Sequence, residues 1–205
     1  MRYWLMKTEP DTFSIDDLER VRVEPWTGVR NYTARNSMRD GMQVGDGVLF
    51  YHSSCEPPGV AGLARVSRTG VVDATQFEPS SPYYDPGSTR ASPRWICVEV
   101  AFERRLPRLL PLAELRAEAG LDGMLLFQRG MRLSVQPVSE AHFGAIVAMA
   151  ERPASVNAGA EAKPAAKKPP PAKKPAPAKK PAAKKPAASK PAPAKKPPAA
   201  RQKRR

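Results

Sequence analysis

Residues 26–36, WTGVRNYTARN, gather aromatic, amide and guanidinium side chains that suit recognition of a flat, polar ligand. Trp26 offers an aromatic face, and Gly28 lets the backbone approach a ligand closely. Asn31 and Asn36 can each donate and accept hydrogen bonds. A protein that reads a nucleobase usually takes it out of the stack, places it on an aromatic face and pairs its edge with amide or backbone groups. This stretch therefore predicts a base-binding pocket.

Arginines from the same part of the chain, Arg30, Arg35 and Arg39, are predicted to contact phosphate groups or to stack on bases. If a helix begins near Asn31, then Asn31 and Arg35 lie one turn apart on a single face. The plainer alternative is that Asn31 only caps that helix, Trp26 fills the core and the arginines form a solvated face. Spacing alone does not exclude this alternative.

His52 and Cys55 come nearest to an enzymatic pair, because they lie three positions apart at the end of an expected strand. A Cys–His pair also needs a group that orients the base and a donor for the oxyanion, and no motif indicates either. Phosphate-loop, dinucleotide-binding and two-Cys or two-His metal motifs do not occur in the sequence. We therefore expect no enzyme activity, no catalytic residues, no metal and no cofactor.

The charge of the chain is divided very unevenly. Residues 1–150 hold 17 of the 34 Lys and Arg and 18 of the 20 Asp and Glu, a net charge of −1, so residues 151–205 have a net charge of +15. Lys, Pro and Ala dominate the later part, where KKP begins at 167, 173, 179, 184 and 195. Proline at that density prevents a stable helix, and too few apolar side chains are present for a core. We expect a globular domain over residues 1–152 and a disordered basic tail over residues 153–205.

Such a tail is typical of an arm that seeks a polyanion. Its expected phosphate contacts are paired lysines, namely Lys167, Lys168, Lys173, Lys174, Lys179 and Lys180. The sequence shows no signal-peptide pattern, no apolar run of membrane-spanning length and no disulfide framework, so we expect a soluble, intracellular protein without a membrane partner. In residues 1–150, 16 Arg against one Lys suggest a GC-rich genome. This favours a bacterial cytoplasmic protein at the nucleoid, with a eukaryotic nucleus as the alternative.

Short strands and short helices are expected along the first 150 residues. The strands are expected where apolar side chains alternate or run together, at residues 2–6, 48–53, 59–68, 95–102 and 132–137. The helices are expected at residues 14–20, 31–39, 111–120 and from 139 onward. A long irregular loop is expected at residues 76–93. Strands without βαβ repetition predict an α+β fold, a compact barrel-like domain in which residues 48–53 and 59–68 pair as an antiparallel hairpin.

Several longer stretches resemble the EVE domain family. They include YWLMKTEP (3–10), the segment from Trp26 to Val66, YYDPGS (83–88), RWICVEVAF (94–102) and RLSVQPVS (132–139), in the family's order over about residues 2–150. The resemblance implies a PUA-like fold, a small mixed β-barrel with peripheral short helices, related to the YTH readers of N6-methyladenosine. It also implies a reader of modified bases, above all modified cytosine in DNA, which holds a flipped base in a pocket and has no established catalytic activity.

Carried over position by position, the resemblance assigns to this pocket Trp26, Asn31, Arg35, Asn36, Tyr51, His52 and Ser53, and in second rank Lys7, Thr8 and Ser134. Trp26 would stack on the base, and Asn31 or Asn36 would address its edge. Because side chains alternate along a strand, however, Tyr51 and His52 should point to opposite faces. The family more often has KSEP and YHSNC where this chain has KTEP and YHSSC. The smaller Ser54 is therefore expected to bear on which modification is preferred.

A domain of net charge −1 has no strong sequence-independent attraction to DNA, and the tail is expected to supply it. The expected partner is nucleic acid that carries a modified base, DNA rather than RNA. The oligomeric state stays open, with a monomer expected. Two other functions also stay open: an architectural nucleoid or chromatin protein that acts through its tail, and an enzyme that acts on nucleic acid.

Overall fold

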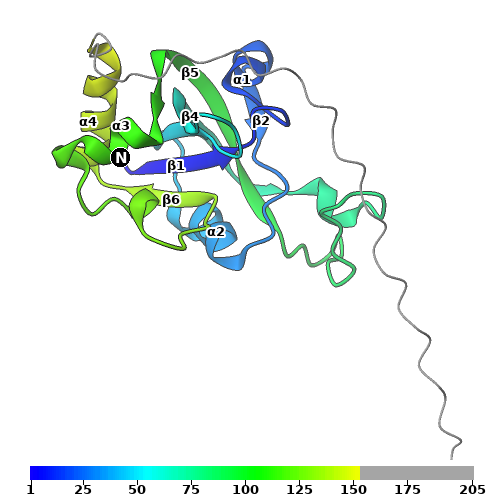
Figure 1. Cartoon of the computed structure of the whole chain (residues 1–205). Helices are drawn as coiled ribbons and strands as arrows, with labels where there is room; N and C mark the ends of the chain where they lie inside the picture. Colours follow the sequence, from blue (N-terminus) through cyan, green and yellow to red (C-terminus); the bar gives the residue numbers. More distant parts are fainter. Residues whose placement is uncertain (153–205) are drawn as a thin grey trace, which may run out of the picture. The chain divides into compact units, whose positions relative to one another are not determined.

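The computed structural model describes residues 1–152; the basic tail, with its six predicted phosphate-contacting lysines, lies outside the described residues. Within residues 1–152, short helices surround a six-stranded mixed sheet (Figure 1). The strands are β1 (Tyr3–Thr8), β2 (Val23–Pro25), β3 (Gly47–His52), β4 (Gly59–Val72), β5 (Ile96–Pro111) and β6 (Val135–Val138). The α-helices are α1 (Ile15–Val21), α2 (Tyr32–Asn36), α3 (Leu112–Ala117) and α4 (Glu140–Glu151). The π-helical turn η1 (Ser37–Gly41) and three 3₁₀ turns, η2 (Ala74–Phe77), η3 (Ala119–Leu121) and η4 (Leu125–Phe127), complete the set.

The strands follow the order β2-β5-β4-β3-β1-β6 across the sheet. β1 pairs in parallel with β3, and the other neighbours pair antiparallel. The antiparallel pairing expected for residues 48–53 and 59–68 is confirmed. β4 and β5 run further than the sequence predicts, and their pairing shifts register at several points. Such irregularities bend a strand and increase its twist, which allows this sheet to curve around a core.

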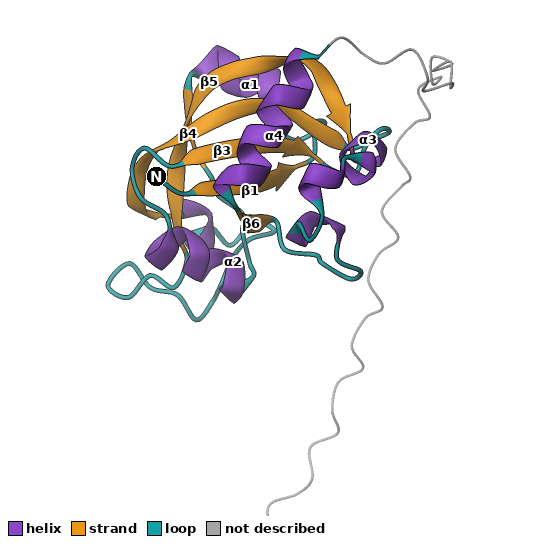
Figure 2. Cartoon of the chain, turned by 90° about the vertical axis from the view of Figure 1, so that its left-hand side faces the viewer, coloured by secondary structure: helices purple, strands orange, loops and turns teal. Residues whose placement is uncertain are grey.

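Both faces of the sheet are buried, which explains the nearly continuous apolar run of β1. Trp4 and Met6 belong to one core cluster with side chains of α1 and α2, whereas Leu5 belongs to a second cluster with side chains of α4. Figure 2 shows α4 lying across the face of the sheet that carries this second cluster. Side chains that alternate along one strand therefore enter two separate cores.

Helix starts follow local rules in two places that the sequence predicts. Ser14 caps α1 in a capping box with Asp17, where the Ser14 side chain accepts a hydrogen bond from the Asp17 backbone N–H. Asn31 caps α2 through its side-chain oxygen alone, which accepts from the Ala34 N–H at 3.1 Å. The capping role proposed as the plainer reading of Asn31 is therefore present, although it uses only the amide oxygen of the side chain.

The structure adds one strand that the sequence does not predict and corrects the bounds of three predicted elements. The sequence prediction misses β2, because a strand of three residues has no detectable alternation and exists only through its pairing with β5. The helix expected over residues 31–39 ends at Asn36 and continues as η1, and the one expected over 111–120 ends at Ala117. The strand expected from residue 132 begins only at Val135, and its polar residue Gln136 is buried. Its amide donates to the Leu133 carbonyl at 2.9 Å.

Candidate functional site

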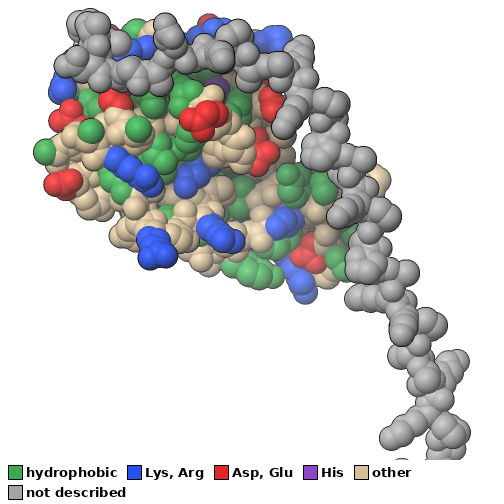
Figure 3. Space-filling view, viewed as in Figure 1, with side chains coloured by type: hydrophobic (Ala, Val, Ile, Leu, Met, Phe, Trp, Pro, Cys, Tyr) green, Lys and Arg blue, Asp and Glu red, His purple; other side chains and the backbone are tan. Residues whose placement is uncertain are grey.

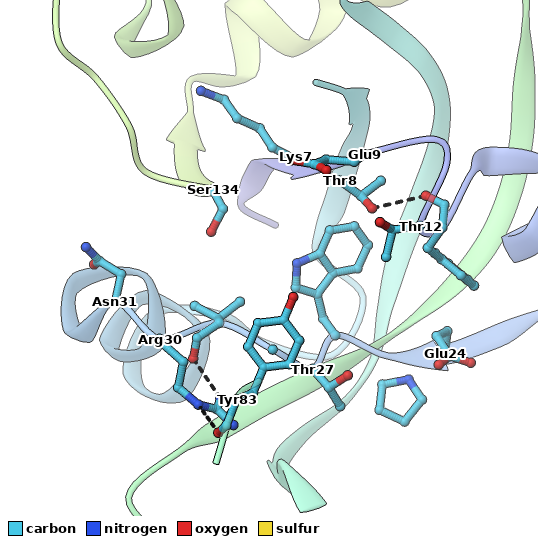
Figure 4. Close-up of a pocket in the computed structure, with 15 residues that line it drawn as sticks. Lys7, Thr8, Glu9, Thr12, Glu24, Thr27, Arg30, Asn31, Tyr83 and Ser134 are labelled. Atoms are coloured by element: carbon cyan, nitrogen blue, oxygen red, sulfur yellow. Dashed lines mark hydrogen bonds between the residues drawn. The ribbon is translucent and has the colours of Figure 1, made fainter. Parts of the chain in front are cut away.

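A cleft of about 560 Å³ opens between the end of β1, the segment that follows β2 and the loop after η2 (Figure 4). Three aromatic side chains line it, from Phe13, Trp26 and Tyr83. Its polar lining includes Thr8, Thr12, Thr27, Asn31, Ser134 and the carboxylates of Glu9 and Glu24. Aromatic side chains beside converging polar groups are a usual feature of small-ligand sites, although this lining is more polar than most.

Trp26 serves both the core and the cleft. It is only 7% exposed, and its ring meets Phe50 edge to face with centroids 5.6 Å apart. Its backbone N–H donates to the Val98 carbonyl on β5 at 2.8 Å, which fixes the segment after β2 against the sheet. The two sequence interpretations of Trp26, core filler and pocket wall, are therefore compatible with each other.

Tyr83, from the loop after η2, lines the cleft as well. It is the main lining residue that the sequence does not predict. It is 41% exposed, and a Cβ at position 28 would lie 2.9 Å from its ring, so a larger residue there would displace the ring. Gly28 also has φ +80°, a backbone conformation that favours glycine. Figure 4 shows Tyr83 beside Arg30 and Thr27, across the cleft from Lys7, Thr8 and Glu9. The signals in the sequence were the stretch YYDPGS and the length of its loop.

Buried Asp73 holds these two walls together. One carboxylate oxygen accepts from the Gly28 N–H at 3.0 Å and from Arg30 Nη1 at 2.7 Å, and the other accepts from the Thr75 N–H and hydroxyl. Burial by itself raises the pKa of Asp73, but the hydrogen bonds from Arg30, Thr75 and Gly28 outweigh it and lower the pKa. The charged carboxylate is therefore the form that the fold stabilises.

Arg30, predicted to contact phosphate, is engaged inside the domain. Besides Asp73, its guanidinium donates to the Tyr83 carbonyl at 2.6 Å and to the Thr75 hydroxyl at 2.9 Å, and it lies 5.1 Å from the centroid of the Trp95 ring. With all three guanidinium nitrogens used, Arg30 positions the Tyr83 loop and retains little capacity for a phosphate.

A second buried polar side chain, Gln76, organises the rest of this loop. Its amide nitrogen donates to the carbonyls of Asp73 and Trp95, and its oxygen accepts from the backbone N–H groups of Arg94 and Trp95 and from the Ser88 hydroxyl. The Trp95 indole N–H in turn donates to Asp85 at 2.8 Å. The loop expected at residues 76–93 is therefore irregular but extensively hydrogen-bonded.

On the other side of the cleft, the end of β1 lies against the segment before β6. The Lys7 N–H donates to the Ser134 carbonyl at 2.8 Å, and the Thr8 hydroxyl donates to the Phe13 carbonyl at 3.0 Å. Five of the ten predicted pocket residues thus line one cleft: Lys7, Thr8, Trp26, Asn31 and Ser134. The capping bond of Asn31 leaves its amide nitrogen available to a ligand.

The other predicted pocket residues lie outside this cleft. His52 points to the opposite face from Tyr51, as strand alternation predicts, and its Nε2 accepts from the Ile15 N–H at 3.1 Å. Tyr51 and Ser53 line a second hollow, which includes Lys7. The imidazole of His52 thus stabilises the start of α1.

Arg35, Asn36 and Arg39 lie on the outer side of α2 and η1. Arg35 stacks over Tyr32, 4.7 Å from the ring centroid, and its guanidinium donates to the Asn36 side-chain oxygen at 2.7 Å. Arg39, expected at a phosphate, pairs with Asp40 at 2.7 Å. None of these three side chains lines the cleft. The amide of Asn36 therefore does not share a site with that of Asn31.

The Cys–His pair considered from the sequence has no activating geometry. Cys55 Sγ donates to the Pro57 carbonyl, and burial, Asp11 and Glu56 raise the pKa of its thiol. Burial lowers the pKa of His52, against the opposite effect of Asp16. A thiol with a raised pKa is a poor nucleophile. Among residues 1–152, no three His, Cys, Asp or Glu side chains are grouped as a metal site requires.

Comparison with known proteins assigns the domain. The model of the EVE domain matches residues 2–149. The chain belongs to the EVE domain family. It is 41% identical to human thymocyte nuclear protein 1 over 169 aligned residues, which cover 73% of this chain and 74% of that protein.

Solved structures confirm the fold expected for an EVE domain. A hypothetical protein from Leishmania major is 48% identical, with a TM-score of 0.70, over 74% of this chain and 95% of that one. Human THYN1 protein in complex with 5-methylcytosine-containing DNA is 39% identical, also with a TM-score of 0.70, over 75% of this chain and 99% of that one. The PUA-like α+β class, with its mixed sheet and short helices, is thus confirmed. No helix within residues 1–152 is long and apolar enough to cross a membrane.

Proposed function

We propose that this EVE domain binds DNA and reads a modified cytosine, which enters the cleft between Trp26 and Tyr83 as a flipped base. The observation that carries this proposal is the cleft itself, in which aromatic rings from two distant segments stand beside amide, hydroxyl and carboxylate groups. The human relative solved with 5-methylcytosine-containing DNA supports the choice of ligand.

The charges of the lining favour a base over a phosphate. Glu9 and Glu24 both line the cleft, and their carboxylates would repel a phosphate group. Of the two cations in the lining, Lys7 and Arg30, the second is already paired with Asp73. Carboxylates can instead accept a hydrogen bond from the exocyclic amine of cytosine. The amide nitrogen of Asn31 is a donor for the base's acceptor atoms. A base therefore suits this cleft, and the phosphates must bind elsewhere.

Tyr83→Ala is the first test of this cleft. Because stacking on an aromatic side chain contributes about 1–3 kcal/mol per base, we expect affinity for a 5-methylcytosine duplex to fall roughly 5- to 150-fold, with a smaller loss for plain cytosine. Tyr84→Ala is a matched control, because Tyr84 is 42% exposed against 41% for Tyr83 and does not line the cleft. Binding of wild type and both variants is measured on duplexes that differ in one cytosine, namely plain, 5-methyl or 5-hydroxymethyl.

Equal affinity of wild type for all three duplexes would overturn the proposal of a modified-base reader. Equal losses in the Tyr83 and Tyr84 variants would instead remove the cleft from the mechanism and favour an architectural protein that acts through its tail. Turnover of any of these duplexes would favour the enzymatic alternative.

The basic tail is proposed to supply sequence-independent affinity. Removing residues 158–205 is expected to weaken binding to every duplex and to flatten its salt dependence, because fewer counterions are released. The ratio of affinities for modified and plain DNA should stay the same. DNA titrations of the full-length and the shortened protein at several salt concentrations measure the affinity and its salt dependence. Unchanged affinity of the shortened protein at low salt would contradict the role proposed for the tail.

Several narrower features belong to the same proposal. We expect a monomeric domain over residues 1–152, with residues 153–205 as the arm, and DNA rather than RNA as the partner. A bacterial nucleoid is the proposed location, with the nucleus as the alternative that the name of the relatives, thymocyte nuclear protein 1, supports.

A further inference from the structure

A second hollow of about 510 Å³ lies between the end of β3, the start of α3 and the segment from η4 toward β6. Four cationic side chains line it, from Lys7, Arg116, Arg129 and Arg132. Its lining contains no Asp or Glu. The base cleft differs in charge, because its lining combines two carboxylates, Glu9 and Glu24, with two cations, Lys7 and Arg30.

The arginines of this hollow differ from the other arginines of the domain. Ten arginines of residues 1–152 form ion pairs with carboxylates: Arg20, Arg30, Arg39, Arg65, Arg68, Arg94, Arg104, Arg105, Arg108 and Arg152. Arg2 and Arg35 donate to carbonyls, and Arg22 and Arg90 lie over phenylalanine rings. In the described part of the chain, only Arg116, Arg129 and Arg132 have no partner of these kinds, and all three line the hollow.

Lys7 adds a fourth cation without a carboxylate. Its ammonium lies 5.9 Å from the centroid of the Tyr51 ring, which also lines the hollow. The side chain is half-buried, and this burial lowers the pKa of the ammonium. An anion in the hollow would compensate the loss of hydration.

The hollow and the base cleft are neighbours. Lys7 lines both, and residues 129–134 run from the hollow, at Arg129 and Arg132, to the cleft, at Ser134. On the face seen in Figure 3, several Lys and Arg side chains lie over the region of β6 and α2. A nucleic-acid strand with one base in the cleft could therefore lay its backbone along the cationic side chains of the hollow.

We propose that this hollow, lined by Lys7, Arg116, Arg129 and Arg132, binds the phosphodiester backbone of the DNA strand whose base enters the cleft. The assignment to that strand rests on the proposed function, whereas the binding of a polyanion here rests only on the unpaired cations. Phosphate contacts orient a protein on DNA without reading its sequence. The hollow therefore sets position and affinity, and the cleft sets selectivity.

The test is a full-length R116Q/R129Q/R132Q variant beside an R20Q/R65Q/R104Q variant. Both lose three positive charges, but the control arginines are paired with carboxylates elsewhere on the domain. Each neutralised phosphate contributes about 0.9 to the slope of log affinity against log salt concentration. We expect the hollow variant to lower this slope by about two to three and the affinity at about 0.1 M salt at least tenfold, equally for 5-methylcytosine and plain duplexes.

The control variant should change the slope by less than about one, because its charges act only at long range. The same slope in both variants would overturn the proposed hollow site. If wild type shows no preference for the modified base, the proposed reading function fails, while the difference between the two slopes still decides whether the hollow binds DNA. All six arginines are on the surface, so we expect both variants to keep the melting temperature of the wild type. Thermal melting therefore checks that unfolding does not cause the loss of binding.

Discussion

Replacing Asp73 with Ala is expected to lower the free energy of unfolding of the domain by about 3–5 kcal/mol, because it removes one partner of a buried ion pair. Its side chain is 1% exposed and that of Arg30 is 21% exposed. The substitution also leaves the backbone N–H groups of Gly28 and Thr75 without their acceptor. Chemical denaturation measures the loss, and a change below about 1 kcal/mol would contradict the role of Asp73 as the clamp between the walls of the cleft.

Asp73→Asn tests the charge separately, because it keeps the shape of the side chain. The pKa of Asp73 lies below its ordinary value in the folded protein, so the unfolded chain binds this proton more tightly. The stability that Asp73 contributes is therefore complete above the ordinary Asp pKa of about 3.9 and is lost as the pH falls through the folded pKa. We expect the difference in unfolding free energy between wild type and Asp73→Asn to be constant at neutral pH and to narrow below about pH 4.

Trp26→Ala is expected to have an effect of similar size on stability, about 3–5 kcal/mol, because it removes a buried aromatic side chain from the core. Trp26 contacts Phe50 within the core cluster and lines the cleft with its remaining surface. The same change should abolish preference for a modified base. Chemical denaturation and duplex binding are both measured on this variant. Loss of binding alone could come from misfolding or from loss of the ring on which the base stacks.

Trp26→Phe makes this separation possible. A phenylalanine keeps an aromatic ring in the core, so we expect a smaller loss of stability, about 1–2 kcal/mol, and a folded domain at room temperature. Its ring presents less surface to the cleft, so the ratio of affinities for modified and plain cytosine should fall while binding through the hollow and the tail persists. A folded Trp26→Phe variant with undiminished selectivity would show that another group holds the base.

Much of the fold could be predicted from local patterns. The alternation in WICVEVAF places β5, Ser14 caps α1, and the strand of residues 48–53 pairs with the one that follows it. These features depend on periodicity and on neighbours within a few residues. β2 could not be found in this way, because Val23–Pro25 becomes a strand only when β5 lies beside it.

The candidate site was predictable only in part. Trp26, Asn31 and the end of β1, which the resemblance assigns to one pocket, do line one cleft. Tyr83 was missed, since no local pattern links it to Gly28, 55 positions earlier. Arg30 is predicted to contact phosphate or to stack on a base from the chemistry of its guanidinium, whereas its partners Asp73 and Tyr83 are more than 40 residues away in the chain.

The amino-acid sequence by itself determined the family, the mixed α+β class, the division between a nearly neutral domain and a strongly basic tail, and the type of ligand to expect. The tertiary structure alone decided which side chains meet. Tyr51 and His52 are neighbours in sequence but point to opposite faces of β3, one into a core cluster and the other to the start of α1. The arginines divide into those with partners in the domain and the three that line the hollow. The physical reason is that composition and periodicity act locally, whereas a cleft is assembled by a few buried polar groups, here Asp73 and Gln76, whose partners are distant in the chain.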